Sequence, residues 1–71
     1  MSIVRSENRA HNAACLVAEQ TRQQTMAGVT NQGGAISADI TFFRACLASA
    51  IANNCSTSCF ELGLKSLGVN V

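Results

Sequence analysis

Four cysteines and one histidine are the residues of this 71-residue chain whose side chains bind metals or form covalent bonds most readily. The cysteines are Cys15, Cys46, Cys55 and Cys59, and the histidine is His11. In a reducing compartment such a set indicates metal or redox chemistry, and in an oxidising one it indicates disulfides. The chemistry therefore depends on which cysteines the fold brings together.

Three helices are expected to position these residues. Proline is absent, and good helix formers dominate the first part of the chain, which predicts a helix at about residues 3–31. Its inward face is expected to be a row of small residues at helical spacing, which would let a second helix approach closely. That row comprises Ala10, Ala14, Val17, Thr21, Thr25 and Gly28.

A second helix is predicted at about residues 37–54. Ser37 is a suitable N-cap, Asp39 suits the positive end of the helix dipole, and the pair Asn53–Asn54 can end a helix in the left-handed conformation. Apolar side chains surround this helix on nearly every side, so more than one neighbour must cover it. Its main apolar stripe comprises Ile36, Ile40, Phe43, Leu47 and Ile51.

The break between these helices is the sequence Asn-Gln-Gly-Gly, which predicts a short turn over residues 31–36 and an antiparallel hairpin. A third helix is predicted at about residues 58–67, where Ser58 and Glu61 fit a capping box and Gly68 stops the helix. The predicted fold is therefore all-α, a long antiparallel helical hairpin plus a short C-terminal helix, in a single domain over residues 1–71.

Hairpin geometry predicts which cysteines meet. With the turn at residues 31–36, Cys15 lies about 24 Å from it along the first helix, a depth that the second helix reaches just before Cys55. Disulfides need Cα atoms within about 7 Å, so Cys15 is expected to reach Cys55, or Cys59 if the third helix folds back. Cys46 lies about 10 Å short of that level, which leaves it without a partner in its own chain.

Three interpretations of the cysteines stay open from the sequence. In the first, Cys15 forms a disulfide with Cys55 or Cys59, and the remaining cysteines form disulfides with neighbouring chains. In the second, all four cysteines are reduced and buried as small hydrophobic side chains. In the third, His11 and Cys15, one turn apart on a helix, join Cys55 and Cys59 to bind zinc. Neither an orienting acid nor an oxyanion site accompanies Cys15 and His11, so we expect a protein without enzymatic activity.

Composition favours a component of a larger assembly. Charged residues make up 13% of the chain, about half the usual share, and a chain this short buries only about 60% of its unfolded surface. Phe42 turns about 100° away from the stripe residue Phe43 and lies beside Cys46. Phe42 and Cys46 are therefore predicted to form a small patch that docks on a partner.

Charge and hydropathy argue against other partners. The net charge is +1, and the basic residues are scattered, so we expect no nucleic-acid binding. The first residues lack an apolar leader, and charges interrupt the best apolar stretch before it reaches about 18 residues, so we expect a soluble chain without a membrane partner.

Residues 41–54 (TFFRACLASAIANN) and 59–68 (CFELGLKSLG) resemble short, alanine-rich helical proteins encoded among the structural genes of tailed bacteriophages. The resemblance implies a minor virion protein that decorates or links capsid subunits. Its partners would be larger protein subunits, and its cysteines would become covalent clips outside the host. The alternative expectation is a small cytoplasmic helical interaction module or regulator, stabilised by zinc through His11, Cys15, Cys55 and Cys59.

Overall fold

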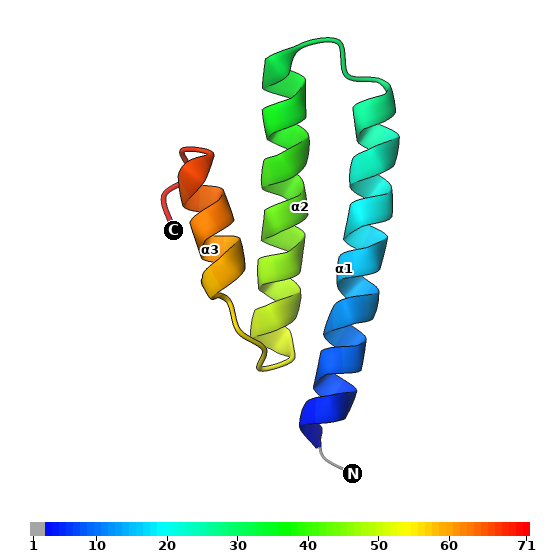
Figure 1. The fold of residues 1–71 in the computed structure, drawn as a ribbon, viewed down its shortest axis with the longest axis vertical. Helices are drawn as coiled ribbons and strands as arrows, with labels where there is room; N and C mark the ends of the chain where they lie inside the picture. The colour runs from blue at the N-terminus through cyan, green and yellow to red at the C-terminus, as the bar shows by residue number, and fades with distance from the viewer. Residues whose placement is uncertain (1–2) are drawn as a thin grey trace.

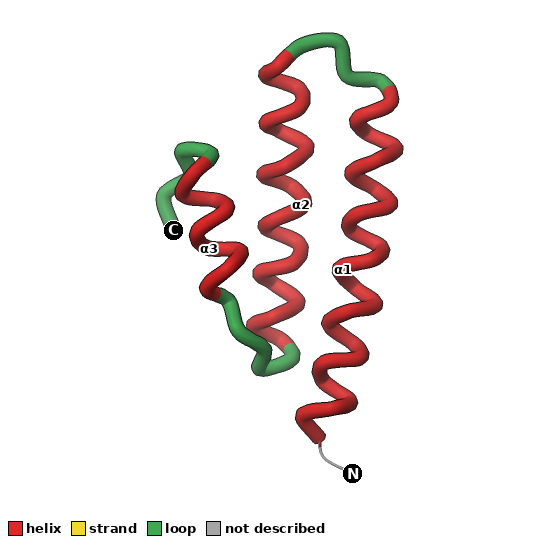
Figure 2. Tube along the Cα trace, in the orientation of Figure 1, coloured by secondary structure: helices red, strands yellow, loops and turns green. Residues whose placement is uncertain are grey.

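Three helices joined by two short connections make up the fold, in a computed structural model that describes residues 3–71, with side chains from residue 8 onward (Figure 1). α1 spans Ile3–Ala27, α2 spans Gln32–Ala52 and α3 spans Ser58–Ser66. α2 lies in the middle, with α1 antiparallel to it on one side and the short α3 folded back along the other (Figure 2). The predicted all-α hairpin with a short third helix is confirmed.

The turn of the hairpin is shorter than predicted, because α2 begins at Gln32 rather than near Ser37. Asn31 is its N-cap: the backbone is extended there, and the Asn31 side-chain oxygen accepts a hydrogen bond of 2.8 Å from the amide of Gly34. A Cβ atom at Gly34 would meet the side chain of Val29 at 3.3 Å, so the glycine lets the connection pack tightly against the helix start. The Gly-Gly pair therefore belongs to the first turn of α2.

The predicted ends of the second and third helices are confirmed. Asn54 has a φ of 55°, the left-handed conformation expected where α2 stops. Gly68 has a φ of +88° after α3, and the amides of Gly68 and Val69 bond to carbonyls in the last turn of that helix. The start of α3 differs from the prediction: Thr57, not Ser58, is the N-cap, and it makes no side-chain cap hydrogen bond. The Thr57 hydroxyl instead donates to the Glu61 carboxylate, so the predicted capping box of Ser58 and Glu61 is not formed.

The molecule is one helix thick. Its Cα atoms extend 46 × 25 × 12 Å, and the shortest dimension is the direction of view in Figure 1. A single layer has few interior positions, and the most enclosed side chains are correspondingly small. Those less than a tenth exposed, among the residues whose side chains are described, are His11, Ala38, Cys46, Ala50 and Leu64.

The face of α1 that packs on α2 is rotated from the predicted one. The predicted inward residues are all exposed: Ala10, Ala14, Val17, Thr21, Thr25 and Gly28. The described α1 residues that are buried or half-buried are mostly their neighbours in sequence: His11, Cys15, Ala18, Glu19, Arg22 and Met26. The two rows differ by about one residue, or about 100° around the helix. The predicted face was therefore wrong, because small residues occur on several sides of α1 and do not identify which side packs.

α3 packs on the side of α2 that carries Phe43. A Cβ atom at Gly63 would lie only 2.8 Å from the Phe43 ring, so the glycine lets α3 lie directly on that ring. In the predicted stripe of α2, Phe43 and its neighbours are half-buried, whereas Ile36 and Ile51 at the two ends are 37% and 65% exposed. The stripe therefore contributes to the core only in its middle.

α2 is also long and apolar enough to cross a membrane by length and composition, with a mean hydropathy of 1.4 over its best 18-residue window. Within the described residues it is the helix that meets this criterion. The central helix of a small helical protein passes the same test, so this property alone assigns no location.

Candidate functional site

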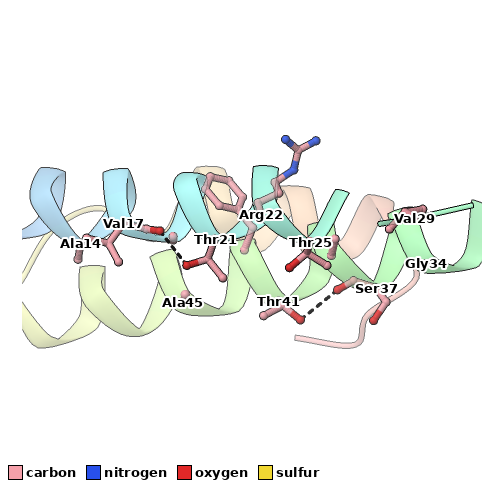
Figure 3. A pocket seen from close by; sticks show the side chains of 13 residues that line it. Ala14, Val17, Thr21, Arg22, Thr25, Val29, Gly34, Ser37, Thr41 and Ala45 are labelled. Carbon is pink, nitrogen blue, oxygen red and sulfur yellow. Dashed lines mark hydrogen bonds between the residues drawn. The ribbon is translucent and has the colours of Figure 1, made fainter. Parts of the chain in front are cut away.

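An open groove runs between α1 and α2 on one face of the layer (Figure 3). Its volume is about 510 Å³, and its walls are made mainly of alanine, valine and threonine side chains. The lining residues are Ala14, Val17, Ala18, Thr21, Arg22, Thr25 and Val29 from α1 and the following turn, and Gly34, Ser37, Ala38, Thr41, Phe42 and Ala45 from α2.

Four residues of the small-residue row that was predicted to face inward line one wall of this groove: Ala14, Val17, Thr21 and Thr25. Val17 is 60% exposed there, and Thr21 and Thr25 continue the row toward the hairpin turn. Phe42, predicted to be part of a docking patch, lines the opposite wall and is half-buried. A segment that entered the groove would contact Phe42, as the docking prediction requires.

Two of the threonine hydroxyls that line the groove donate hydrogen bonds within the chain. The Thr21 hydroxyl donates to the carbonyl of Val17 at 3.1 Å, and the Thr41 hydroxyl donates to the carbonyl of Ser37 at 3.0 Å, as the dashed lines in Figure 3 show. These threonines have used their donors on their own helices. The groove surface is consequently more apolar than its residue types suggest.

Arg22 is the charged residue among the described residues that line the groove, and its charge is paired. Its Nε donates to Asp39 Oδ1 of α2 at 2.6 Å, and Nη1 donates to Glu19 Oε1 at 3.3 Å. The hydrogen bond and the negative charge of Asp39, followed by those of Glu19, raise the pKa of the Arg22 guanidinium. Figure 3 shows this guanidinium extending beyond the helices. Because Arg22 is ion-paired, the described residues that line the groove carry no unpaired charge.

The second candidate site is centred on His11, which is 9% exposed and contacts all three helices. Its Nδ1 is 2.9 Å from the Ser49 hydroxyl of α2, and its ring meets the edge of Phe60 of α3 at a centroid distance of 5.5 Å. The Cys15 sulfur, one turn along α1, lies 3.6 Å from Nε2 and 3.8 Å from Nδ1. One of the interpretations from the sequence made His11 a zinc ligand, and instead it joins the three helices.

Cys46 lies beside Cys15 in this cluster. It is 1% exposed, and burial, followed by interaction with the Cys15 side chain, raises the pKa of its thiol from 9.0 to about 12. The prediction that Cys46 has no neighbour in its own chain is therefore wrong. A side chain this enclosed also cannot dock on a partner, so Phe42 alone remains of the predicted patch.

The error in the cysteine register comes from the helix boundaries. Cys15 lies 12 residues before the end of α1 and Cys46 lies 14 residues after the start of α2. At 1.5 Å per residue these depths are about 18 and 21 Å, so the two cysteines stand at nearly the same level. The predicted boundaries had placed the turn four to five residues too late.

The other two cysteines lie elsewhere. The Cys55 thiol donates to Asn8 Oδ1 at 3.3 Å, and Asn8 lies about two helical turns before Cys15 on α1. Cys59 is exposed. All four cysteines are in the thiol form, so the predicted link from Cys15 to Cys55 or Cys59 is not present. Among the described residues, no three His, Cys, Asp or Glu side chains gather closely enough to hold a metal, so the zinc set His11, Cys15, Cys55 and Cys59 is not assembled.

Comparison with known proteins leaves the geometry as the basis for function. No family model, no curated protein and no solved structure matches this chain.

Proposed function

We propose that this protein is a non-enzymatic structural subunit that docks through the α1–α2 groove onto a second layer of helices. The observation that carries this proposal is the 12 Å thickness of the fold, which leaves an apolar groove of about 510 Å³ open on one face. Protein domains are generally built from at least two packed layers around a shared core. A one-layer chain with mostly small buried side chains obtains that second layer from another chain.

The occupant that we propose for the groove is a second copy of this chain. Two helical hairpins that pack face to face form a four-helix bundle, a common and stable arrangement. Across a twofold axis a charge near the axis approaches its own copy, so a self-associating face favours paired charges near its centre. The groove meets this condition because Arg22, the charged residue in its described lining, is ion-paired with Asp39 of α2 and with Glu19 of its own helix.

The size of the molecule is compatible with such a dimer. A standard interface buries about 800 Å² on each partner, which is about a sixth of the 4813 Å² exposed by the single chain. Among the exposed large apolar side chains, Val17, at 60%, lines the groove together with the half-buried Val29 and Phe42. Burying them would supply the apolar contact area that the single layer lacks.

We propose further that the dimer is an accessory component of a virion, where it decorates or links larger capsid subunits. The resemblance of residues 41–54 and 59–68 to short structural proteins of tailed bacteriophages supports this assignment. The low share of charged residues, 13%, supports a subunit of an assembly rather than a soluble monomer.

Sedimentation velocity of the full chain in reductant, over a wide range of concentrations, tests the proposed association. We expect a reversible monomer–dimer equilibrium and a melting temperature that rises with concentration, because folding and association are linked. A compact monomer at every concentration, with a sharp and concentration-independent melting transition, would overturn the proposal.

A further inference from the structure

Cys15 and Cys46 come from different helices and meet in the His11 cluster. His11 contacts the Cys15 sulfur at 3.6 Å and the Ser49 hydroxyl at 2.9 Å, and Ser49 lies one turn after Cys46 on α2. The two cysteines also stand at nearly the same depth from the hairpin turn, which places them opposite each other across the helix pair. The hairpin thus brings two thiols from adjacent helices into one cluster.

The two thiols differ in access to solvent. Cys15 is half-buried, whereas Cys46 is 1% exposed, so a reagent in solution meets Cys15 first. The Cys15 sulfur also lies against the imidazole of His11, 3.6 Å from Nε2 and 3.8 Å from Nδ1. Cys15 therefore suits the role of the attacking thiol, and Cys46 suits the role of the thiol that resolves the product.

We propose that Cys15 and Cys46 are a reversible redox pair, closed by a low-molecular-weight disulfide into a bond that joins α1 to α2. The Cys15 thiolate attacks one sulfur of the small disulfide, which releases one small thiol and leaves a mixed disulfide on Cys15. The Cys46 thiol then attacks the Cys15 sulfur, which forms the Cys15–Cys46 bond and breaks the mixed disulfide, and the departing small thiolate takes the proton from Cys46. The protein loses two electrons and two protons, and the small disulfide gains them as two thiols.

The Cys15–Cys46 disulfide would act on the groove that we propose as the docking face, so this consequence rests on the proposed function. Cys15 lies between Ala14 and Ala18 of one groove wall, and Cys46 directly follows Ala45 of the other. A covalent link between these positions fixes the separation of the two walls. Oxidation would thereby set the docking face in a single geometry.

Reaction with oxidised glutathione tests the pair in a full-length chain carrying Cys55→Ser and Cys59→Ser, which leaves only the two cysteines of interest. Serine can keep the hydrogen bond from position 55 to Asn8. We expect intact-mass analysis to show loss of both thiols without retained glutathione, in a monomeric chain, and dithiothreitol to restore both. Circular dichroism of the reduced variant checks that it remains as helical as the unmodified chain.

Two matched variants in the same background separate the roles of the thiols. With Cys46→Ala, we expect glutathione to remain attached to Cys15, because nothing resolves the mixed disulfide. With Cys15→Ala, we expect Cys46 to stay unmodified until the chain is denatured. If the Ser variants lose helicity, fragment mapping of the oxidised unmodified chain replaces them, and it must find Cys15 joined to Cys46.

Two results would overturn the redox pair. One is a glutathione adduct that persists on Cys15 although Cys46 is present, and the other is a disulfide between chains in place of the internal one. Both are independent of the docking proposal, which concerns the reduced chain. A reduced monomer that forms the internal disulfide would refute the docking face alone, and a reduced dimer that does not form it would refute the redox pair alone.

Discussion

Two neighbouring residues of α1 offer a matched test of the docking face. Val17 and Leu16 are both 60% exposed in the single chain, but only Val17 lines the groove. Substituting either by lysine removes a similarly exposed apolar side chain and adds one positive charge. Their effects on the fold of the monomer should therefore be similar, and their effects on association should differ.

The expected loss can be worked from the exposure of Val17. Burying a valine side chain completely stabilises a complex by about 1.5–3 kcal/mol, so burying the 60% still exposed contributes about 1–2 kcal/mol. Both copies contribute in a dimer, which gives about 2–4 kcal/mol and a dissociation constant raised by about 30-fold to several hundred-fold. The desolvation of two lysines facing each other adds to this loss.

Sedimentation velocity and light scattering of the reduced proteins measure the difference. We expect Val17→Lys to be monomeric at concentrations where the unmodified chain and Leu16→Lys are dimeric. Helicity by circular dichroism should be alike for the two variants at matched oligomeric state. If Leu16→Lys dissociates the dimer and Val17→Lys does not, the groove is not the docking face.

Three further expectations concern the fold itself. Gly63→Ala places a Cβ atom 2.8 Å from the Phe43 ring, so the cost of overpacking should outweigh the gain in helix propensity. We expect urea titrations to show a free energy of unfolding lower by about 1 kcal/mol. A more stable variant would show that the Phe43 ring moves aside freely. Asn31→Ala removes the cap of α2 and should also lower stability by about 1 kcal/mol, with faster hydrogen exchange at the Gly34 amide; unchanged exchange would mean that the cap is not the source of protection. The Cys46 thiol has a pKa raised from 9.0 to about 12, so between these pH values the thiol loses its proton in the unfolded state before it does in the folded state. The free energy of unfolding should therefore fall by up to about 1.4 kcal/mol per pH unit from pH 9 to about pH 12. The fall should be shallower in Cys46→Ala, and an equal fall in both proteins would refute the raised pKa of Cys46.

Local signals predicted the number and order of the helices and the ends of α2 and α3, whereas α1 ends at Ala27 rather than near residue 31. Asn54 and Gly68 adopt the positive φ values that helix stops require, and both were identified from residue type alone. The start of α2 was missed because the two glycines resembled a turn, although Asn31 caps a helix as well as Ser37 would. That error of a few residues was enough to separate Cys15 from Cys46 in the predicted hairpin.

The packing face of α1 could not be predicted from apolar periodicity. Two of its residues, His11 and Arg22, are polar, and they are half-buried or buried because their partners lie on α2. Ser49 and Asp39 are 38 and 17 residues further along the chain, so no local pattern reveals these contacts. Small residues on the neighbouring side of α1 looked like a core and instead form the wall of the groove.

The one-helix thickness of the fold also bears on how many copies a cell or particle can hold. In the proposed assembly, a chain without its second layer keeps one side of both long helices in water, and it is expected to open more often than an assembled one. Proteases cut chains in proportion to the time they spend open. Surplus copies would be degraded while seated ones persist, so the abundance of the protein would follow the number of places available to it.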